Sequence, residues 1–329
     1  MTEANTMDHS GLIFAFILDG QGGGQSVSWK EIEEWKTSSG TLWVNLAGES
    51  PIAEEWLRQK SGLDAITCDA LTREDVRPRS MLTGSGLLTI LRGINLNPGD
   101  DPEDMVSVRI YIENNRIITA RHRFVRSIDD LRRAIEANEG PGTVGEFLSG
   151  LGLRLVDRMS DMIEKKSEEV DELEEAIVHE YSSEIAERLA NVRRQIVSLR
   201  RHLAPQREAL GRIPSFRIEF LNEEDLNRLR EVMDQTMHFI EELDSARDRA
   251  MVTQEELNNR LSKQLERRMY ALSLIAAIFL PLSFLTGLLG INVGGIPGAE
   301  KHNGFLFVAI ILSVIMGFQL LLFKKMKWI

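Results

Sequence analysis

The chain carries two long runs without a charged side chain close to its C-terminus. The first, Tyr270 to Ile291, reads YALSLIAAIFLPLSFLTGLLGI, and the second, Gly304 to Phe323, reads GFLFVAIILSVIMGFQLLLF. Crossing the hydrocarbon core of a bilayer takes roughly 20 residues of helix, so either run is long enough to span it. The alternative is a pair of buried helices in a large soluble core, which two adjacent helices that are apolar all round make less favourable. The sequence therefore predicts two transmembrane helices.

Charge is divided unevenly between these spans and the rest of the chain. The protein has 50 acidic and 39 basic residues and a net charge of −11. Residues 269–329 contribute one acidic residue and four lysines, which leaves residues 1–268 with 49 acidic and 35 basic residues, a net charge of −14. The basic residues that flank the two spans are Lys263, Arg267, Arg268, Lys324, Lys325 and Lys327. Because such residues favour the cytoplasmic side, we expect both termini in the cytoplasm and the connection 292–303 outside.

The remaining composition excludes several classes of protein. A single cysteine, Cys68, cannot form a disulfide within its own chain, which excludes a disulfide-stapled secreted module. The acidic net charge repels phosphate, so we expect no nucleic-acid partner. The glycine run 22–24 lacks the residues that follow it in a phosphate-binding loop, and no nucleophile is arranged with a base. We therefore expect neither an enzyme nor a bound cofactor.

The pattern along the chain predicts a cytoplasmic α/β domain followed by helices. Runs with strand character occur at Leu12–Leu18, Thr41–Leu46, Gly86–Leu96, Met105–Ile112 and Arg116–His122. An antiparallel helix pair is expected next, at 143–181 and 182–203. The expected boundaries are 1–140 for the α/β domain, 141–221 for a helical hairpin, 222–291 for a stalk helix that becomes the first span at about residue 270, 292–303 for a periplasmic loop, 304–323 for the second span and 324–329 for a basic tail.

The stalk is expected to be one continuous helix, because from about Asn222 onward the first proline is Pro281 and the first glycine is Gly287. At 1.5 Å per residue it would be about 105 Å long. Apolar residues recur along one face at intervals of about 3.6 residues, which predicts a straight bundle. They are Leu243, Ala246, Ala250, Leu257, Leu261, Leu265, Met269 and Leu272. This face packs either against other copies of the chain or against the chain's own helices, and both interpretations stay open.

Two spans cannot enclose a water-filled path, so a transport function requires several copies of the chain in a homo-oligomer. No Asp, Glu, His, Lys or Arg lies within either apolar run, although carriers that move protons along side chains place such groups at membrane depth. Zinc favours His and Cys ligands, but the six histidines form no close pair and there is one cysteine. We therefore expect a path that passes a hydrated ion without holding it tightly.

The first span ends in a motif that points to a family. Residues 281–292 read PLSFLTGLLGIN, and residues 293–298 read VGGIPG. An asparagine amide can face a cation or its water without a charge that would trap it, although Gly and Asn are also common at ordinary helix ends. The chain resembles the CorA family of divalent-cation transporters, which carries Gly-Met-Asn after a P-L-[ST]-F stretch. Gly290-Ile291-Asn292 and the basic C-terminal end are similar to the ZntB zinc-transporter branch of that family.

This resemblance implies a funnel-shaped homopentamer in a bacterial inner membrane, with the first span lining a central pore. The outer ring would be formed by Asn292 with Gly290 and Ile291, and the pore would be lined by Ser283, Leu280, Leu272, Met269 and Leu265. Isoleucine in place of the family's methionine at position 291 favours zinc as the transported substrate, with uptake favoured over efflux. The expected partners are Zn²⁺ and other divalent cations, the lipid bilayer and further copies of the chain. The alternatives are a CorA-type magnesium or cobalt channel and a membrane-anchored scaffold without transport.

Overall fold

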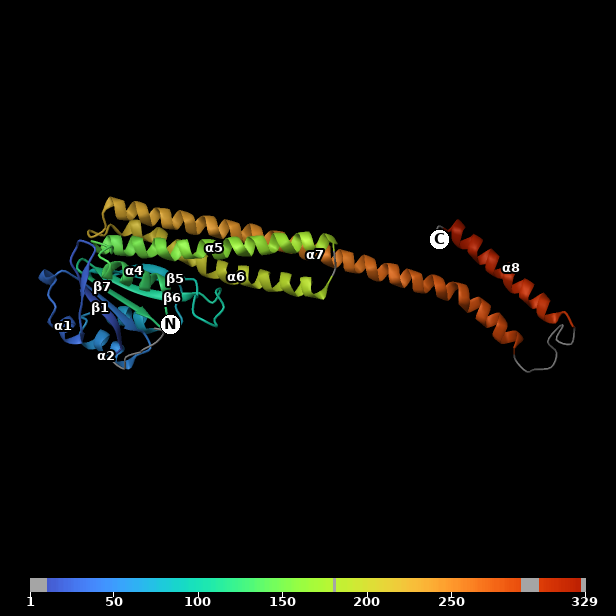
Figure 1. The fold of residues 1–329 in the computed structure, drawn as a ribbon, viewed down its shortest axis with the longest axis horizontal. Helices are drawn as coiled ribbons and strands as arrows, with labels where there is room; N and C mark the ends of the chain where they lie inside the picture. Colours follow the sequence, from blue (N-terminus) through green and yellow to red (C-terminus); the bar gives the residue numbers. More distant parts are fainter. Residues whose placement is uncertain (1–10, 180–181, 291–301, 327–329) are drawn as a thin grey trace. The chain divides into compact units, whose positions relative to one another are not determined.

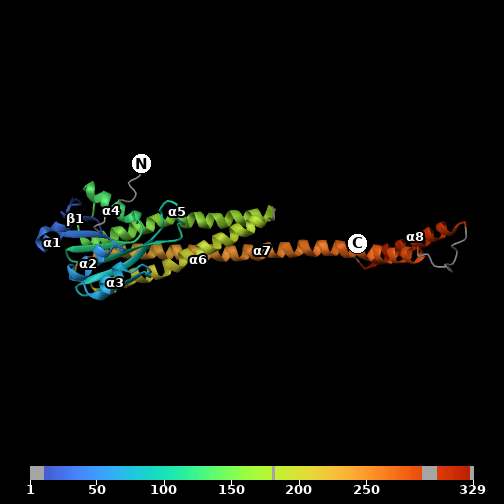
Figure 2. The ribbon, with the colours of Figure 1, turned by 90° about the horizontal axis from the view of Figure 1, so that it is seen from below.

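The computed structural model describes residues 11–179, 182–290 and 302–326. Two compact units divide the chain, residues 1–254 and 255–329, and each is described by itself. Figures 1 and 2 show the elements from two sides. An α/β domain, a long helix and two C-terminal apolar helices are all present, which confirms the fold class expected for the single chain.

The first unit contains a mixed seven-stranded sheet with the strand order β2-β1-β3-β7-β6-β5-β4. The strands are β1 (Leu12–Leu18), β2 (Gly24–Ser26), β3 (Thr41–Ala47), β4 (Arg79–Thr83), β5 (Gly86–Gly93), β6 (Val106–Glu113) and β7 (Arg116–Arg121). β3 and β7 pair in parallel, and the other neighbours are antiparallel. The five strands predicted from the sequence are confirmed, although β5 ends three residues before its predicted end. The sequence missed the edge strands β2 and β4, which have three and five residues and show little alternation.

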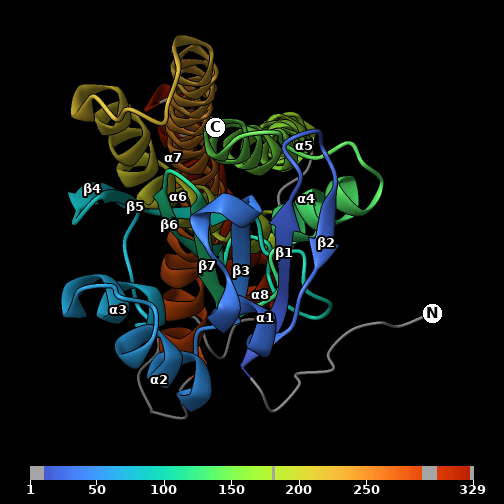
Figure 3. The same cartoon turned by 90° about the vertical axis from the view of Figure 1, so that its left-hand side faces the viewer.

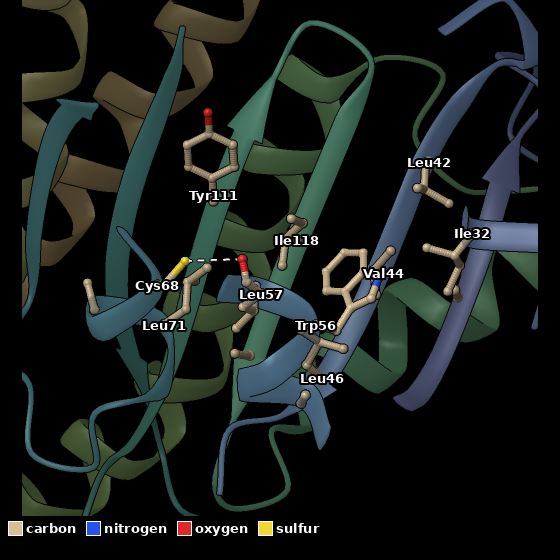
Figure 4. Packing of buried hydrophobic residues seen from close by; sticks show 14 of the residues in the cluster. Ile32, Leu42, Val44, Leu46, Trp56, Leu57, Cys68, Leu71, Tyr111 and Ile118 are labelled. Atoms are coloured by element: carbon tan, nitrogen blue, oxygen red, sulfur yellow. Dashed lines mark hydrogen bonds between the residues drawn. The ribbon is translucent and has the colours of Figure 1, made fainter. Parts of the chain in front are cut away.

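Helices cover both faces of this sheet, because successive strand residues point to opposite sides. On one face, Leu42 and Val44 of β3 pack with Trp56 and Leu71 of the covering helices (Figure 4). On the other face, Trp43 is fully buried, and its Nε1 donates to Thr119 Oγ1 at 3.0 Å. The Trp43 ring packs edge-on against the ring of Phe147, which belongs to the long helix that begins at Val144. Figure 3 shows α2 and α3 on one side and α4 and α5 on the other. The short helices are α1 (Trp29–Glu34), η1 (Thr37–Ser39), α2 (Pro51–Gln59), α3 (Ala65–Thr72), α4 (Arg126–Glu136) and η2 (Ile213–Phe216).

Three long helices complete the first unit. They are α5 (Val144–His179), α6 (Ser183–Arg212) and the N-terminal part of α7 (Glu223–Leu289). Arg200 Nε of α6 lies 2.5 Å from Asp244 Oδ1 of α7, and Arg249 Nε of α7 lies 3.0 Å from Asp171 Oδ1 of α5. The predicted end of the second helix at Leu203 was wrong, because α6 continues to Arg212 with Pro205 inside it.

The predicted apolar face of the stalk has two different environments. Leu243, Ala246 and Ala250 are at most 1% exposed within the first unit. This part of the face packs against the chain's own helices, as one of the two interpretations of the sequence expected. Leu265 and Met269, further along α7, are 51% and 62% exposed. The face is therefore covered in its first part and uncovered in its second.

Gly145 of α5 lies against the beginning of α7, where Asn222 and Asp225 cap the helix reciprocally. The Asn222 N–H donates to Asp225 Oδ2 at 3.1 Å, and the Asp225 N–H donates to Asn222 Oδ1 at 2.8 Å. Asp225 is 1% exposed, and a Cβ at Gly145 would overlap with its carboxylate. We expect Gly145→Ala to destabilise the cytoplasmic domain by about 1–3 kcal/mol, the usual cost of overpacking.

Calorimetry of the full chain in detergent measures this effect as a lowered midpoint of the cytoplasmic unfolding transition. The matched control is Gly150→Ala on the same helix, where the added Cβ would meet Arg154 Nη1 at 3.1 Å, the end of a flexible side chain. Equal midpoints for the two variants would show that the cap of α7 tolerates the extra methyl group.

The second unit contains the C-terminal part of α7 and α8 (Gly304–Lys325). The most apolar stretches of the two helices have mean hydropathies of 2.2 and 2.7, and no part of either stretch is buried. Core helices of a soluble protein would be covered by other elements, so this finding argues against that alternative. α7 has 67 residues and is about 100 Å long at 1.5 Å per residue. It ends at Leu289, two residues before the predicted end of the span, while α8 continues two residues past Phe323.

Candidate ion path

The predicted pore residues that the structure describes lie on one face of α7. Each residue of an α-helix advances by about 100° around the axis, which places these residues within an arc of about 80°. They are Leu265, Met269, Leu272, Leu280, Ser283 and Gly290. Leu280 is 69% exposed and Leu272 is 61% exposed, so the face is open in the single chain. Ile291 and Asn292, the other two residues of the predicted outer ring, lie outside the described residues.

The opposite side of α7 differs from this face. The half-buried side chains between Tyr270 and Leu289 all lie on that side, centred about 180° from the predicted pore residues. They are Leu274, Ala277, Ile278, Leu282 and Leu285. The side of α7 that carries the predicted pore residues is therefore exposed in the single chain and available for contact with other copies.

The same face contains four residues that the sequence reasoning did not single out. Asn258, Ser262, Ala276 and Gly287 fall within the same arc and are exposed. The helical period of about 3.6 residues, applied to residues of every type, would have placed these four on the same face, but only apolar residues were considered. No charged side chain falls within the arc from Asn258 to Gly290. We call this uncharged arc, with its four small or polar residues and the six predicted ones, the pore face.

A free hydroxyl lies on the pore face near the C-terminal end of α7. The hydroxyl of Ser283 has no hydrogen-bond partner among the described residues, whereas Thr286 Oγ1 donates to the carbonyls of Leu282 and Ser283 at 3.1 Å. The Gly290 N–H donates to the Thr286 carbonyl at 2.9 Å, and Gly290 does not adopt a positive φ. A Cβ at Gly290 would lie 3.0 Å from that carbonyl oxygen. Glycine at this position therefore permits close backbone approach, while Ser283 presents a hydroxyl that water or an ion can use.

Metal-ligating side chains do not converge in the part of the chain that the structure describes. Within residues 11–179, 182–290 and 302–326, no three His, Cys, Asp or Glu side chains are placed to hold one ion. A cavity of about 420 Å³ opens in the first unit at the carboxyl ends of β3 and β7. Its lining residues are Gly48, Glu49, Glu54, Thr72, Glu74, His122 and Arg123. Burial lowers the pKa of His122. The cavity combines carboxylates with an imidazole and a guanidinium, which is not the ligand set of a closed zinc site.

Comparisons with known proteins bear directly on these features. The family model described as "CorA-like Mg2+ transporter protein" matches residues 38–325. The divalent cation transporter CmaX of Pseudomonas aeruginosa is 37% identical over 325 residues, which cover 98% of each chain. The zinc transport protein ZntB of Pectobacterium carotovorum is 32% identical over 98% of each chain. The solved structure of full-length CmaX has a TM-score of 0.85 at 36% identity, covering 98% of this chain and 100% of that one.

The match extends over the α/β domain, the long helix and both apolar helices. Members of the family are ion transporters, which confirms the expectation that the chain is not an enzyme. The family resemblance inferred from Gly290-Ile291-Asn292 and the preceding span is also confirmed. The chain belongs to the CorA family of divalent-cation transporters.

Proposed function

We propose that the protein is a homopentameric zinc transporter of the bacterial inner membrane, in which the ion passes between copies of α7 along the pore face. The observation that carries this proposal is the exposed, uncharged arc from Asn258 to Gly290. One chain cannot cover this arc or close a path around it with two apolar helices. Copies arranged around an axis parallel to α7 cover the arc and line a path with it.

The residues on the pore face divide the path into two parts. Ser283, Gly287 and Gly290 offer a hydroxyl and accessible backbone near the outer end, and Asn292 adds an amide at the mouth. Further in, Leu272, Met269 and Leu265 form an apolar stretch. In this arrangement the ion keeps its water at the polar end and crosses the apolar stretch only when water fills that stretch. The leucine and methionine side chains of all copies, which encircle the path at each level, act as the barrier.

Zinc is proposed over other divalent cations for two reasons. Ile291 replaces the methionine that the family's tripeptide carries, and the similar protein from Pectobacterium carotovorum is named for zinc transport. Magnesium is the second candidate, favoured by the description of the matching family model, which names Mg²⁺. The path itself contains no His, Cys or carboxylate that would distinguish the two ions by direct ligation.

The membrane topology follows from the flanking charges. Lys263, Arg267 and Arg268 precede the first span, and Lys324 and Lys325 end the second. Both termini then lie in the cytoplasm, and the 292–303 connection lies outside. Uptake carries zinc from that connection toward the first unit, and any coupled proton travels with the hydrated ion because the two apolar runs carry no Asp, Glu, His, Lys or Arg.

Zinc flux into vesicles tests the proposal. The full chain is reconstituted in liposomes that contain a zinc-sensitive dye, with the pH gradient and the membrane voltage set separately. We expect zinc to enter only vesicles that contain the protein, and magnesium at the same concentration to leave this flux largely unchanged. Magnesium that displaces zinc at similar concentrations would move the assignment to the second candidate. A strict monomer without flux would contradict every interpretation in which the ion passes between copies.

A further inference from the structure

One side of α5 is acidic over the C-terminal half of the helix. Exposed carboxylates recur there at intervals of three, four or seven residues, which places them on one face of the helix. They are Asp157, Asp161, Glu164, Glu168 and Glu175, and we call them the acidic face of α5. On the opposite side Met159, Ile163 and Val170 are at most 1% exposed. The acidic face therefore points away from the core of its own chain.

Ion pairs do not neutralise the acidic face in the described part of the chain, although the exposed Lys165 lies beside it. Among the described residues none of its five carboxylates forms an ion pair, whereas Asp171 and Glu172 beside it pair with Arg249 and Arg188. Like charges spaced by three or four residues destabilise a helix. In the single chain, repulsion among these carboxylates therefore destabilises α5, and a basic surface of another molecule would relieve this repulsion.

α6 presents the complementary surface. Its exposed arginines Arg193, Arg194 and Arg201 make no ion pair in the described part of the chain, and we call them the basic face of α6. On the side of α6 that faces the core, Val192, Ile196 and Leu203 are at most 1% exposed. An apolar side chain, Val197, is 50% exposed beside these arginines. The basic face is therefore directed outward and includes an uncovered apolar contact.

The two helices that carry these faces lie on different flanks of the bundle. Figure 3, which looks along the helices, shows α5 and α6 on either side of α7. A rotation about an axis parallel to α7 brings the α5 flank of one copy against the α6 flank of the next, which is the head-to-tail contact that closes a ring. Such a rotation keeps residues at equal heights. Lys166 Nζ donates to Gln195 Oε1 at 2.8 Å, so the middle of α5 and the middle of α6 are at the same height.

We propose that the acidic face of α5 in one copy binds the basic face of α6 in the neighbouring copy, with Glu168 opposite Arg194 of the neighbour. The inference rests on the homo-oligomer of the proposed function and names the surfaces that order its cytoplasmic part. Residues 1–268 carry a net charge of −14, so copies of this region repel one another unless opposite charges are brought together. Alternating acidic and basic flanks provide that arrangement at each boundary between copies.

Disulfide cross-linking between two differently labelled chains tests the contact. One full-length chain carries Glu168→Cys and the other carries Arg194→Cys, and the two are reconstituted together and oxidised. The native Cys68 is 1% exposed and does not compete. We expect a dimer that contains both labels, and a ladder of larger products when one chain carries both substitutions. The matched control replaces Glu168→Cys by Glu174→Cys, an exposed acidic position of α5 outside the acidic face.

Charge reversal separates a specific contact from chance proximity. Changing Asp161 and Glu164 to Lys, or Arg193 and Arg201 to Glu, is expected to lower cross-linking at least about threefold, since exposed ion pairs are lost and like charges face each other. Both sets of changes in one chain should restore it. Failure of this restoration, or equal cross-linking of the control pair, overturns the inference. A pentamer by mass without the cross-link overturns the inference alone, whereas a monomer by mass overturns the proposed function as well.

Discussion

Replacing Asn292 by alanine is expected to reduce zinc flux through the reconstituted protein to the level of empty vesicles. The proposed outer ring contributes one amide from each copy at the mouth of the path. An amide oxygen can replace part of the outer water of an arriving cation without holding the ion by charge. Alanine removes every such oxygen at once, and the two apolar runs contain no Asp, Glu, His, Lys or Arg that could take over the role. The loss should therefore appear in flux, while the oligomer and its insertion stay unchanged.

The control for Asn292→Ala is Asn303→Ala. Asn303 is an exposed asparagine at the start of α8, on the same connection between the spans but outside the tripeptide. It should transport zinc like the unmodified chain. Both variants are compared by zinc-dye fluorescence at equal protein content, with the oligomer mass measured in detergent. Undiminished zinc entry through Asn292→Ala would remove the asparagine from the path.

Replacing Gly287 by leucine is the second change with a large expected effect. Gly287 lies within the pore face, between Ser283 and Gly290. A Cβ added there meets nothing within 4 Å in the single chain, so the chain itself has room for the side chain. If copies of α7 surround a path, five leucine side chains would fill the path at one height. We therefore expect the variant to fold, insert and assemble but to pass no zinc.

Gly317→Leu on α8 is the matched control for this occlusion. A Cβ at Gly317 also meets nothing within 4 Å, and Gly317 lies in a span of comparable hydropathy. The two variants add the same side chain to glycines in equally open surroundings, and they differ in the helix that carries the change. Zinc flux in the vesicle assay should be lost for Gly287→Leu and kept for Gly317→Leu. The opposite pattern would mean that α8 lines the path and α7 does not.

Much of the fold could be predicted because its strong signals are local. β1, β3, β6 and β7 combine β-branched and aromatic residues with clear ends, and the apolar helices are long and free of charge. The edge strand β4, Arg79–Thr83, was missed because five residues with a charged first position give no usable alternation. The predicted length of α6 was too short, because a proline weakens a helix locally and the prediction ended the helix before Pro205. The burial of Gln206, Ala209 and Leu210 in the core stabilises the helix after this proline.

The candidate path could be predicted only in part. The positions of Leu265, Met269, Leu272, Leu280 and Ser283 came from the family resemblance, and the structure adds that they share one exposed face of α7. Asn258, Ala276 and Gly287 were missed, because a search for apolar residues passes over small and polar ones. The proposed contact between copies could not be predicted from hydropathy, since the surfaces proposed to face each other depend on the packing of α5, α6 and α7. The boundaries assigned to the cytoplasmic segments and the roles of the path residues stay predictions.

Access of water to Ser283 tests the central claim, that ions cross between copies along one face of α7. In a Ser283→Cys chain the new thiol lies on the pore face, and the native Cys68 is buried at 1% exposure. A charged, water-soluble thiol reagent added to zinc-loaded vesicles should modify this cysteine and stop the flux. Ser313→Cys on α8 is the control, because the hydroxyl of Ser313 donates to the Ala309 carbonyl at 2.8 Å within its own helix. The account predicts block of Ser283→Cys with unchanged flux through Ser313→Cys, and a Ser283→Cys chain that the reagent leaves unmodified and fully active would contradict it.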